Sequence, residues 1–325
     1  MTKLKNDPGS GGGWLAALAG QSYLLLVLAQ LSWAGNIVSG KLAVDQIDPL
    51  SLSLLRWTIA LLVLAPFALS HVRRDLPAIK SNLHWLCLYG ALGFTTFNVL
   101  IYGASTFTSS INISMEQAAI PVLVMVGNFL VFKVRATWMH ILGVILTIYG
   151  VAMVATHGEP ARILGLDVNI GDGMVLLACL CYAFYSLVLR FRPAIHWLSF
   201  LFVTTAAAAL AALGYQLSLG GGPGALVDAV ANTPPAGWII VGYVAIFPSI
   251  LAQLCYARGV ELIGPNRASL FINLLPVFGA ILSVVLAGEK LEGYHLIAAL
   301  FIIGGIVIAE YAARRRTART LKPPV

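Results

Sequence analysis

The feature that most constrains this chain is a series of about ten apolar runs, each close to the length that crosses a lipid bilayer. A membrane-spanning helix needs about 20 mostly apolar residues. The runs that meet this length lie near residues 21–44, 50–70, 83–104, 111–132, 137–156, 173–191, 197–219, 236–257, 267–287 and 292–312. The connections between them are short and leave no room for a soluble domain. The sequence therefore predicts an all-α integral membrane protein with ten transmembrane helices.

The composition agrees with a lipid environment. The 325 residues are 59% hydrophobic and 10% charged, and the mean hydropathy is +0.88, whereas a soluble domain carries about 25% charged residues. The four cysteines all lie in apolar runs without metal-ligand spacing, so we expect them to pack as small hydrophobic side chains. We expect the lipid bilayer and a small-molecule substrate as partners, and neither nucleic acid nor a metal.

The positions of Lys and Arg predict the orientation, because cytoplasmic loops are enriched in both. With the N-terminus inside, the opposite face carries only Lys41, Arg162 and Lys290, while Arg56 lies inside a span. The cytoplasmic segments then carry Lys3, Lys5, Arg73, Arg74, Lys80, Lys133, Arg135, Arg190, Arg192, Arg258, Arg267 and the basic tail. We therefore expect cytoplasmic termini, with a polar tail at 1–20 and a basic tail at 313–325.

The chain also has the pattern of two copies of one unit. Pro121 and Pro276 each interrupt an apolar run, and they are 155 residues apart. Related residues recur at the same offset: Asn98 with Gln253, His140 with His295, and Gly150 with Gly305. Five spans per copy is an odd number, so the second copy enters the membrane in the opposite direction. We expect two inverted five-helix repeats, 21–156 and 173–312, joined by an extracytoplasmic loop at 157–172, around a central cavity near the membrane midplane.

Several short motifs follow one another along the chain: Trp33-Ala34-Gly35-Asn36, Lys41, Pro49, Leu55-Arg56-Trp57, Gly171-Asp172-Gly173, Tyr256-Ala257, Pro276 and Gly288-Glu289-Lys290-Leu291. In these motifs the chain resembles the drug/metabolite transporter superfamily, in particular its ten-helix EamA-type branch. The resemblance implies transport of small metabolites, often amino acids or drugs, in a bacterial inner membrane. One departure is Phe132-Lys133-Val134-Arg135, which stands where the family often repeats its Gly-Glu turn. We expect altered local packing there.

Charged residues inside the predicted spans are candidates for the substrate path, because charge is costly within a bilayer. Glu116 could bind a substrate amine or a proton, or it could be an interfacial carboxylate that is paired or hydrated. Arg56 could hold a substrate carboxylate. The resemblance favours a structural role instead, in which Arg56 ties to the end of a helix.

Amide and hydroxyl groups are the next candidates. Asn98 and Tyr102 are one turn apart on one helix face, and their repeat partners are Gln253 and, with a one-residue slip, Tyr256. Amides from both halves could bind a zwitterion without a permanent charge, or they could only join helices. Two further amides are weighed in the same way, Asn36 and Asn273.

Aromatic residues and prolines complete the predicted site. Trp33 and Tyr182 occupy equivalent positions in the first helices of the two halves, with Tyr185 one turn further. An aromatic pocket with few polar groups suits an aromatic or large aliphatic amino acid, although helix packing is the alternative. Prolines remove a backbone hydrogen bond and bend a helix, so three are candidate hinges for gating: Pro121, Pro248 and Pro276.

We therefore expect a secondary transporter that works by alternating access. Export or exchange of amino acids is the activity we expect first. The alternatives are a multidrug or other metabolite exporter of the same superfamily, a membrane channel, or a membrane enzyme. Phosphorylated cargo is disfavoured because it would need several basic residues in the cavity. An enzyme is disfavoured because no HExxH, GxSxG or P-loop motif occurs, and no cofactor is expected. The oligomeric state, monomer or weak homo-oligomer, and the coupling ion are left open.

Overall fold

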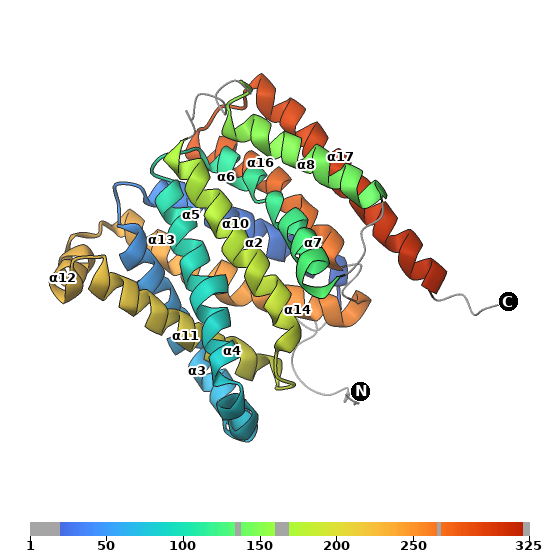
Figure 1. Ribbon diagram of the computed structural model, residues 1–325. Coiled ribbons are helices and arrows are strands. Elements are labelled where there is room, and N and C mark those ends of the chain that lie inside the picture. Colours follow the sequence, from blue (N-terminus) through green and yellow to red (C-terminus); the bar gives the residue numbers. More distant parts are fainter. Residues whose placement is uncertain (1–19, 134–137, 160–168, 265–267, 321–325) are drawn as a thin grey trace.

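A computed structural model describes residues 20–133, 138–159, 169–264 and 268–320, and every regular element in these ranges is a helix (Figure 1). Within these ranges, seven helices are long and apolar enough to cross a membrane: Ser22–Ala43, Pro49–Ser81, Leu83–Ala104, Ser110–Phe132, Ile170–Phe191, Trp197–Ser218 and Pro235–Ile263. Three shorter apolar helices are Ile141–Ala155, Phe271–Ala287 and Gly293–Ile308. The prediction of an all-helical membrane protein is confirmed.

Several of these long helices consist of shorter elements. The continuous ones are α2 (Ser22–Ala43), α3 (Pro49–Ser81), α8 (Trp138–Ala155), α11 (Trp197–Ser218) and α17 (Gly293–Thr320), and α10 (Ile170–Val188) is extended by the 3-10 turn η2 (Leu189–Phe191). The interrupted ones are α4 (Leu83–Leu88), η1 (Tyr89–Thr96) and α5 (Phe97–Ala104); α6 (Ser110–Glu116) and α7 (Ala119–Phe132); α13 (Pro235–Ile246), η3 (Phe247–Leu251) and α14 (Ala252–Ile263); and η4 (Ser269–Leu274) and α16 (Leu275–Ala287). A short helix, α12 (Gly222–Asn232), joins α11 to α13. The largest hydrophobic cluster lies around Trp57, Tyr89 and Tyr185, between α3, η1, α10 and α11.

Prolines account for three of the interruptions. Pro121 and Pro276 have no N–H to donate to the carbonyls of Gln117 and Ile272. In each case the preceding residue supplies the bond: the Ile120 N–H donates to Gln117 O at 3.0 Å, and the Leu275 N–H donates to Ile272 O. The two breaks therefore use the same local repair at positions 155 residues apart.

Pro248 lies in the π-helical segment η3 and has no N–H to donate. The carbonyl of Val244, one turn earlier in α13, therefore lacks its usual hydrogen-bond donor. The Ser249 hydroxyl donates to this carbonyl at 2.7 Å. The proline and the serine that follows it therefore form one unit, and the serine oxygen remains available as an acceptor.

The turns after α7 and α16 share one backbone conformation. Gly288 ends α16 with φ of 68°, and Lys133 ends α7 with φ of 55°, which glycine adopts far more readily than lysine. The carboxylate of Glu289, the residue directly after Gly288, accepts hydrogen bonds from the N–H groups of Ser110 (2.8 Å) and Ile111 (3.0 Å) and so stabilises the start of α6. The turn after α7 thus has, at Lys133, the backbone conformation that Gly288 has after α16. Val134 and Arg135, which follow Lys133 in the predicted turn, lie outside the described residues.

Helices α8 and α17 pack side by side (Figure 1) through two close glycine contacts. A Cβ atom on Gly150 would lie 2.8 Å from the Ala298 carbonyl oxygen, and one on Gly305 would lie 2.5 Å from the Gly143 carbonyl oxygen. Gly143 and Ala298 are themselves 155 residues apart. The contact is therefore reciprocal, as in packing around a two-fold axis.

One pH-dependent feature lies outside the apolar spans, at the start of α11. His196 is the N-cap residue, and its Nδ1 accepts a hydrogen bond from the Leu198 N–H at 3.2 Å. Its ring stacks on His71 with 3.9 Å between centroids. Partial burial and, after it, the neighbouring His71 lower the pKa of His196 below its usual 6.5.

We predict that acidification weakens this cap. The unfolded chain binds the proton more readily than the folded one, so stability falls as the pH decreases through about 6.5. The melting temperature in detergent should drop by about 1–2 °C more in the wild type than in His196→Asn between about pH 7.5 and pH 5.5, because asparagine caps without titrating. Equal drops in both proteins would show that His196 does not contribute.

Candidate substrate-binding site

A buried arginine lies at the centre of the polar groups within the bundle. Arg56 projects from α3 and is 3% exposed. Its Nη1 donates to Asn36 Oδ1 (2.8 Å), Asn98 Oδ1 (2.6 Å) and the Tyr102 hydroxyl (2.5 Å). Its Nε donates to Ser249 Oγ at 2.7 Å. These five residues form what we call the Arg56 cluster, and they come from α2, α3, α5 and η3.

The cluster holds a positive charge without a negative partner. Every acceptor around Arg56 is a neutral side chain, and the ion pairs within the described part of the chain do not include it. Burial of an unpaired charge is expensive. Nη2, with two N–H donors, donates to no residue of the described ranges. The expectation that Arg56 ties to a helix end is wrong, since its bonds go to side chains of neighbouring helices.

The other members of the cluster fix one another. The Tyr102 hydroxyl donates to Asn36 Oδ1 at 2.6 Å, and Asn36 Nδ2 donates to Asn98 Oδ1 at 3.0 Å. Asn98 Nδ2 donates to the Phe94 carbonyl in the π-helical segment η1 at 2.7 Å. The amide and hydroxyl oxygens are thus oriented toward the guanidinium, which is a preorganised arrangement.

Aromatic side chains of both halves of the sequence lie near this cluster. The Trp33 and Tyr256 rings are 5.4 Å apart, and Trp33 Nε1 donates to the Pro248 carbonyl at 3.2 Å. Tyr182 contacts Tyr185 at 5.3 Å between ring centroids. The Trp57 ring lies 4.4 Å from the Arg56 guanidinium carbon, a cation–π contact.

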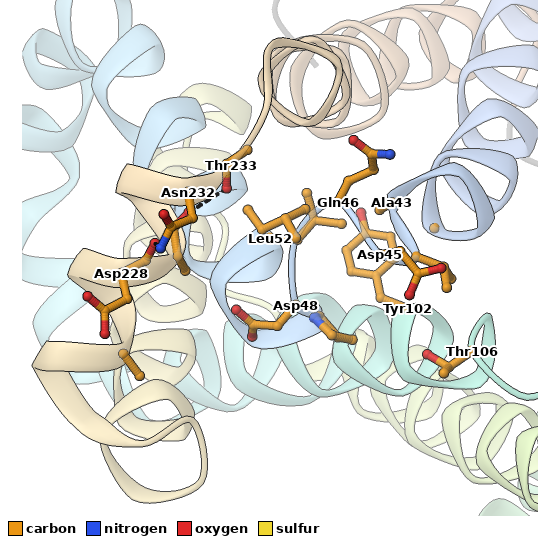
Figure 2. Close-up of a pocket in the computed structure, with 16 residues that line it drawn as sticks. Ala43, Asp45, Gln46, Asp48, Leu52, Tyr102, Thr106, Asp228, Asn232 and Thr233 are labelled. Carbon is orange, nitrogen blue, oxygen red and sulfur yellow. Dashed lines mark hydrogen bonds between the residues drawn. The ribbon is translucent and has the colours of Figure 1, made fainter.

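A cavity of about 640 Å³ opens beside the cluster, between the α2–α3 connection, α5 and α12 (Figure 2). Figure 2 shows Asp228 and Asn232 of α12 on one side of it, and Asp45 and Tyr102 on the other. Asp48 also lines it, whereas no Lys or Arg does. Tyr102 belongs to both the cavity lining and the Arg56 cluster, so the acidic vestibule, as we call this cavity, borders the cluster at Tyr102.

The remaining predicted residues lie elsewhere. Glu116, on α6, is fully buried against α10 and takes no part in the cluster. Gln253 and Asn273 are half-buried on α14 and η4, and within the described ranges no hydrogen bond joins either to the cluster. Neither Ser249 nor the acidic residues of the vestibule were among the residues predicted from the sequence. A serine directly after an intramembrane proline was the available signal for Ser249.

The described part of the chain combines apolar helices of membrane-spanning length with polar side chains buried between them. The profile of the EamA-like transporter family matches residues 20–156 and again 169–311. This chain belongs to the EamA-like transporter family. The family and the names of its relatives point to a transporter of small molecules rather than an enzyme.

Similar proteins include two named as uncharacterized transporters of Bacillus subtilis (strain 168). YyaM is 26% identical over 73% of this chain and 76% of its own length, and YetK is 25% identical over 91% and 89%. The "Probable terminal-alkyne amino-acid exporter" of Streptantibioticus cattleyicolor is 26% identical over 91% of this chain and 96% of its own. A solved crystal structure of a protein shares the fold, with a TM-score of 0.59 at 19% identity over 90% of this chain and 98% of that one.

Proposed function

We propose that this protein is a secondary transporter that exports or exchanges amino acids or similar small zwitterions by alternating access, with Arg56 as the carboxylate anchor. The observation that carries the proposal is the buried guanidinium, whose partners among the described residues are all neutral and whose Nη2 donates to none of them. An arginine binds a carboxylate through paired N–H donors. A substrate carboxylate would also neutralise a charge that the described side chains leave unpaired.

The acidic vestibule supports a cargo with a positive group as well. Asp45, Asp48 and Asp228 line it, and one of them, Asp48, already accepts bonds from the N–H groups of Leu50 and Ser51. The other two remain to attract an ammonium group. A zwitterion that carries both charges fits a path from these carboxylates to Arg56, past Tyr102.

The aromatic residues support a hydrophobic side chain on the cargo. We propose that Trp33, Tyr182, Tyr185 and Tyr256 contact this side chain, with Asn36, Asn98 and Tyr102 around the carboxylate. The cargo would contact Gln253 and Asn273 only in another conformation of the transport cycle. Pro121, Pro248 and Pro276 would serve as the bending points, since each lies where a helix is already interrupted.

We further propose ten spans in two inverted repeats, in the inner membrane of a bacterium, with both termini cytoplasmic. The two matched segments and the reciprocal contacts of Gly150 and Gly305 support a two-fold relation. The distribution of Lys and Arg supports the orientation. A monomer is sufficient for this scheme, because the cavity and the cluster come from one chain.

Counterflow in proteoliposomes tests this function. Vesicles with purified protein are loaded with one unlabelled amino acid of a panel and then exposed to a labelled trace of the same compound. We expect saturable accumulation that is largest for aromatic and large aliphatic amino acids and is absent for their carboxyl-amide analogues. Counterflow of drugs but of no amino acid would favour the multidrug alternative, and a conductance without saturation would favour a channel.

A further inference from the structure

A second buried site lies apart from the Arg56 cluster, where α6 meets the start of α10. Glu116 and Asp172 are both fully buried, and their carboxyl groups are within hydrogen-bonding reach of each other. The Cys179 thiol lies 3.8 Å from the Glu116 carbonyl oxygen. Because Cys179 is seven residues after Asp172, both lie on one face of α10, the face that packs on α6.

Neither carboxyl group has a partner that a carboxylate would need. By distance and angle, no N–H or O–H group of the described residues makes a hydrogen bond to any of the four carboxyl oxygens, and the nearest candidate donor is the Thr108 side chain beside Asp172. Two ionised carboxylates next to each other in a buried site would repel and would both lack hydrogen bonds. A single shared proton removes one charge and supplies the O–H donor that joins the pair. A bound proton therefore satisfies both the charge and the missing hydrogen bonds of the pair.

The described surroundings do not supply another cation. Lys41 of α2 does not bond to the pair, because its Nζ donates to the carbonyls of Ser105 (3.0 Å) and Thr108 (3.2 Å). No group of three or more His, Cys, Asp and Glu in the described ranges is arranged to hold a metal ion. The titratable groups that face the pair from the packed helices are Cys179 of α10, His157 after α8 and, beyond His157, His295 of α17.

We propose that Glu116 and Asp172 form the proton-coupling site of the transporter, which takes up one proton in exchange for exported cargo. The pair lies beside the α5–α6 connection, whose Thr106 lines the acidic vestibule and whose Thr108 is next to Asp172. A movement of this connection would change access to the vestibule and to the pair together. The coupling role rests on the proposed function, whereas the shared proton does not.

The shared proton can be measured without any cargo. Infrared difference spectra of the purified protein, recorded across neutral pH in H₂O and D₂O, should contain a carboxylic-acid C=O band from a buried group. The band should disappear in both Glu116→Gln and Asp172→Asn and persist in Glu261→Gln, an exposed glutamate paired with Arg258. Absence of the band in the wild type, or its persistence in both pair variants, would overturn the proposal. So would a melting temperature that rises with sodium and not with protons.

The coupling is measured by comparing two fluxes of the same vesicles. An inward proton gradient should increase export of the cargo found by counterflow, and the ratio of proton-driven flux to exchange should fall about five- to 150-fold in Glu116→Gln and Asp172→Asn. An unchanged ratio in both variants would refute coupling at this pair. If no amino acid shows counterflow, the proposed function fails, while the infrared band still decides whether the pair holds a proton.

Discussion

Arg56→Gln should reduce amino-acid counterflow by about ten- to 100-fold. Glutamine removes the charge and the Nη2 donors, and a hydrogen bond to a charged group contributes about 1.5–3 kcal/mol, at about 1.4 kcal/mol per factor of ten. Arg56→Lys should recover only part of the activity, because an ammonium group cannot reproduce the planar set of donors that reaches Asn98, Tyr102 and Ser249.

The control for this substitution is Arg258→Gln, which removes an exposed arginine from a surface pair with Glu261 and should leave counterflow within about two-fold of wild type. Comparing two cargoes separates a structural role of Arg56 from a role in binding the substrate carboxylate. The wild type should discriminate strongly between an amino acid and its carboxyl amide, and folded Arg56→Gln protein should lose this discrimination. Retained discrimination in that variant would contradict the carboxylate anchor.

Gly305→Ala should destabilise the protein by about 1–3 kcal/mol, a typical cost of overpacking. The added methyl group would meet the backbone of α8 at the Gly143 carbonyl, 2.5 Å away, and that backbone cannot rotate aside as a side chain can. Membrane helices pack closely through such small residues. The loss should appear as a lower melting temperature and a shorter half-life in detergent.

The adjacent Gly304 provides a matched control, because a Cβ atom there has no neighbour within 4 Å. Gly304→Ala should be neutral or stabilising by up to about 1 kcal/mol, the helix propensity gain of alanine. The reciprocal contact predicts that Gly150→Ala destabilises to a similar extent as Gly305→Ala. A large effect at Gly304, or none at both contact glycines, would contradict the close packing of α8 on α17.

Local rules predicted the parts of this molecule that depend on neighbours in the sequence. Apolar run length gave the positions of the helices, and the missing proline N–H gave the positions of the breaks near Pro121, Pro248 and Pro276. The spacing of Asn98 and Tyr102 correctly placed both on one helix face, and both contact Arg56. These predictions follow from backbone geometry within one or two turns.

Contacts between distant segments could not be predicted in the same way. Arg56 and Ser249 are 193 residues apart, and only the packing of α3 against η3 brings them together. Asp172 occurs in a recognisable helix-start motif, yet nothing in that motif shows that the start of α10 is buried against Glu116. At the 155-residue offset Glu116 corresponds to the apolar Phe271, so the repeat gives no sign of the neighbouring acid Asp172.

The most direct test of the central claim is a structure of the protein with an amino acid bound. We expect the ligand carboxylate to lie within hydrogen-bonding distance of Arg56 Nη2, next to Asn98 and Tyr102, with the ligand side chain against Trp33 or Tyr182. A bound amino acid whose carboxylate lies away from Arg56, with the four hydrogen bonds of Arg56 unchanged, would contradict the carboxylate anchor.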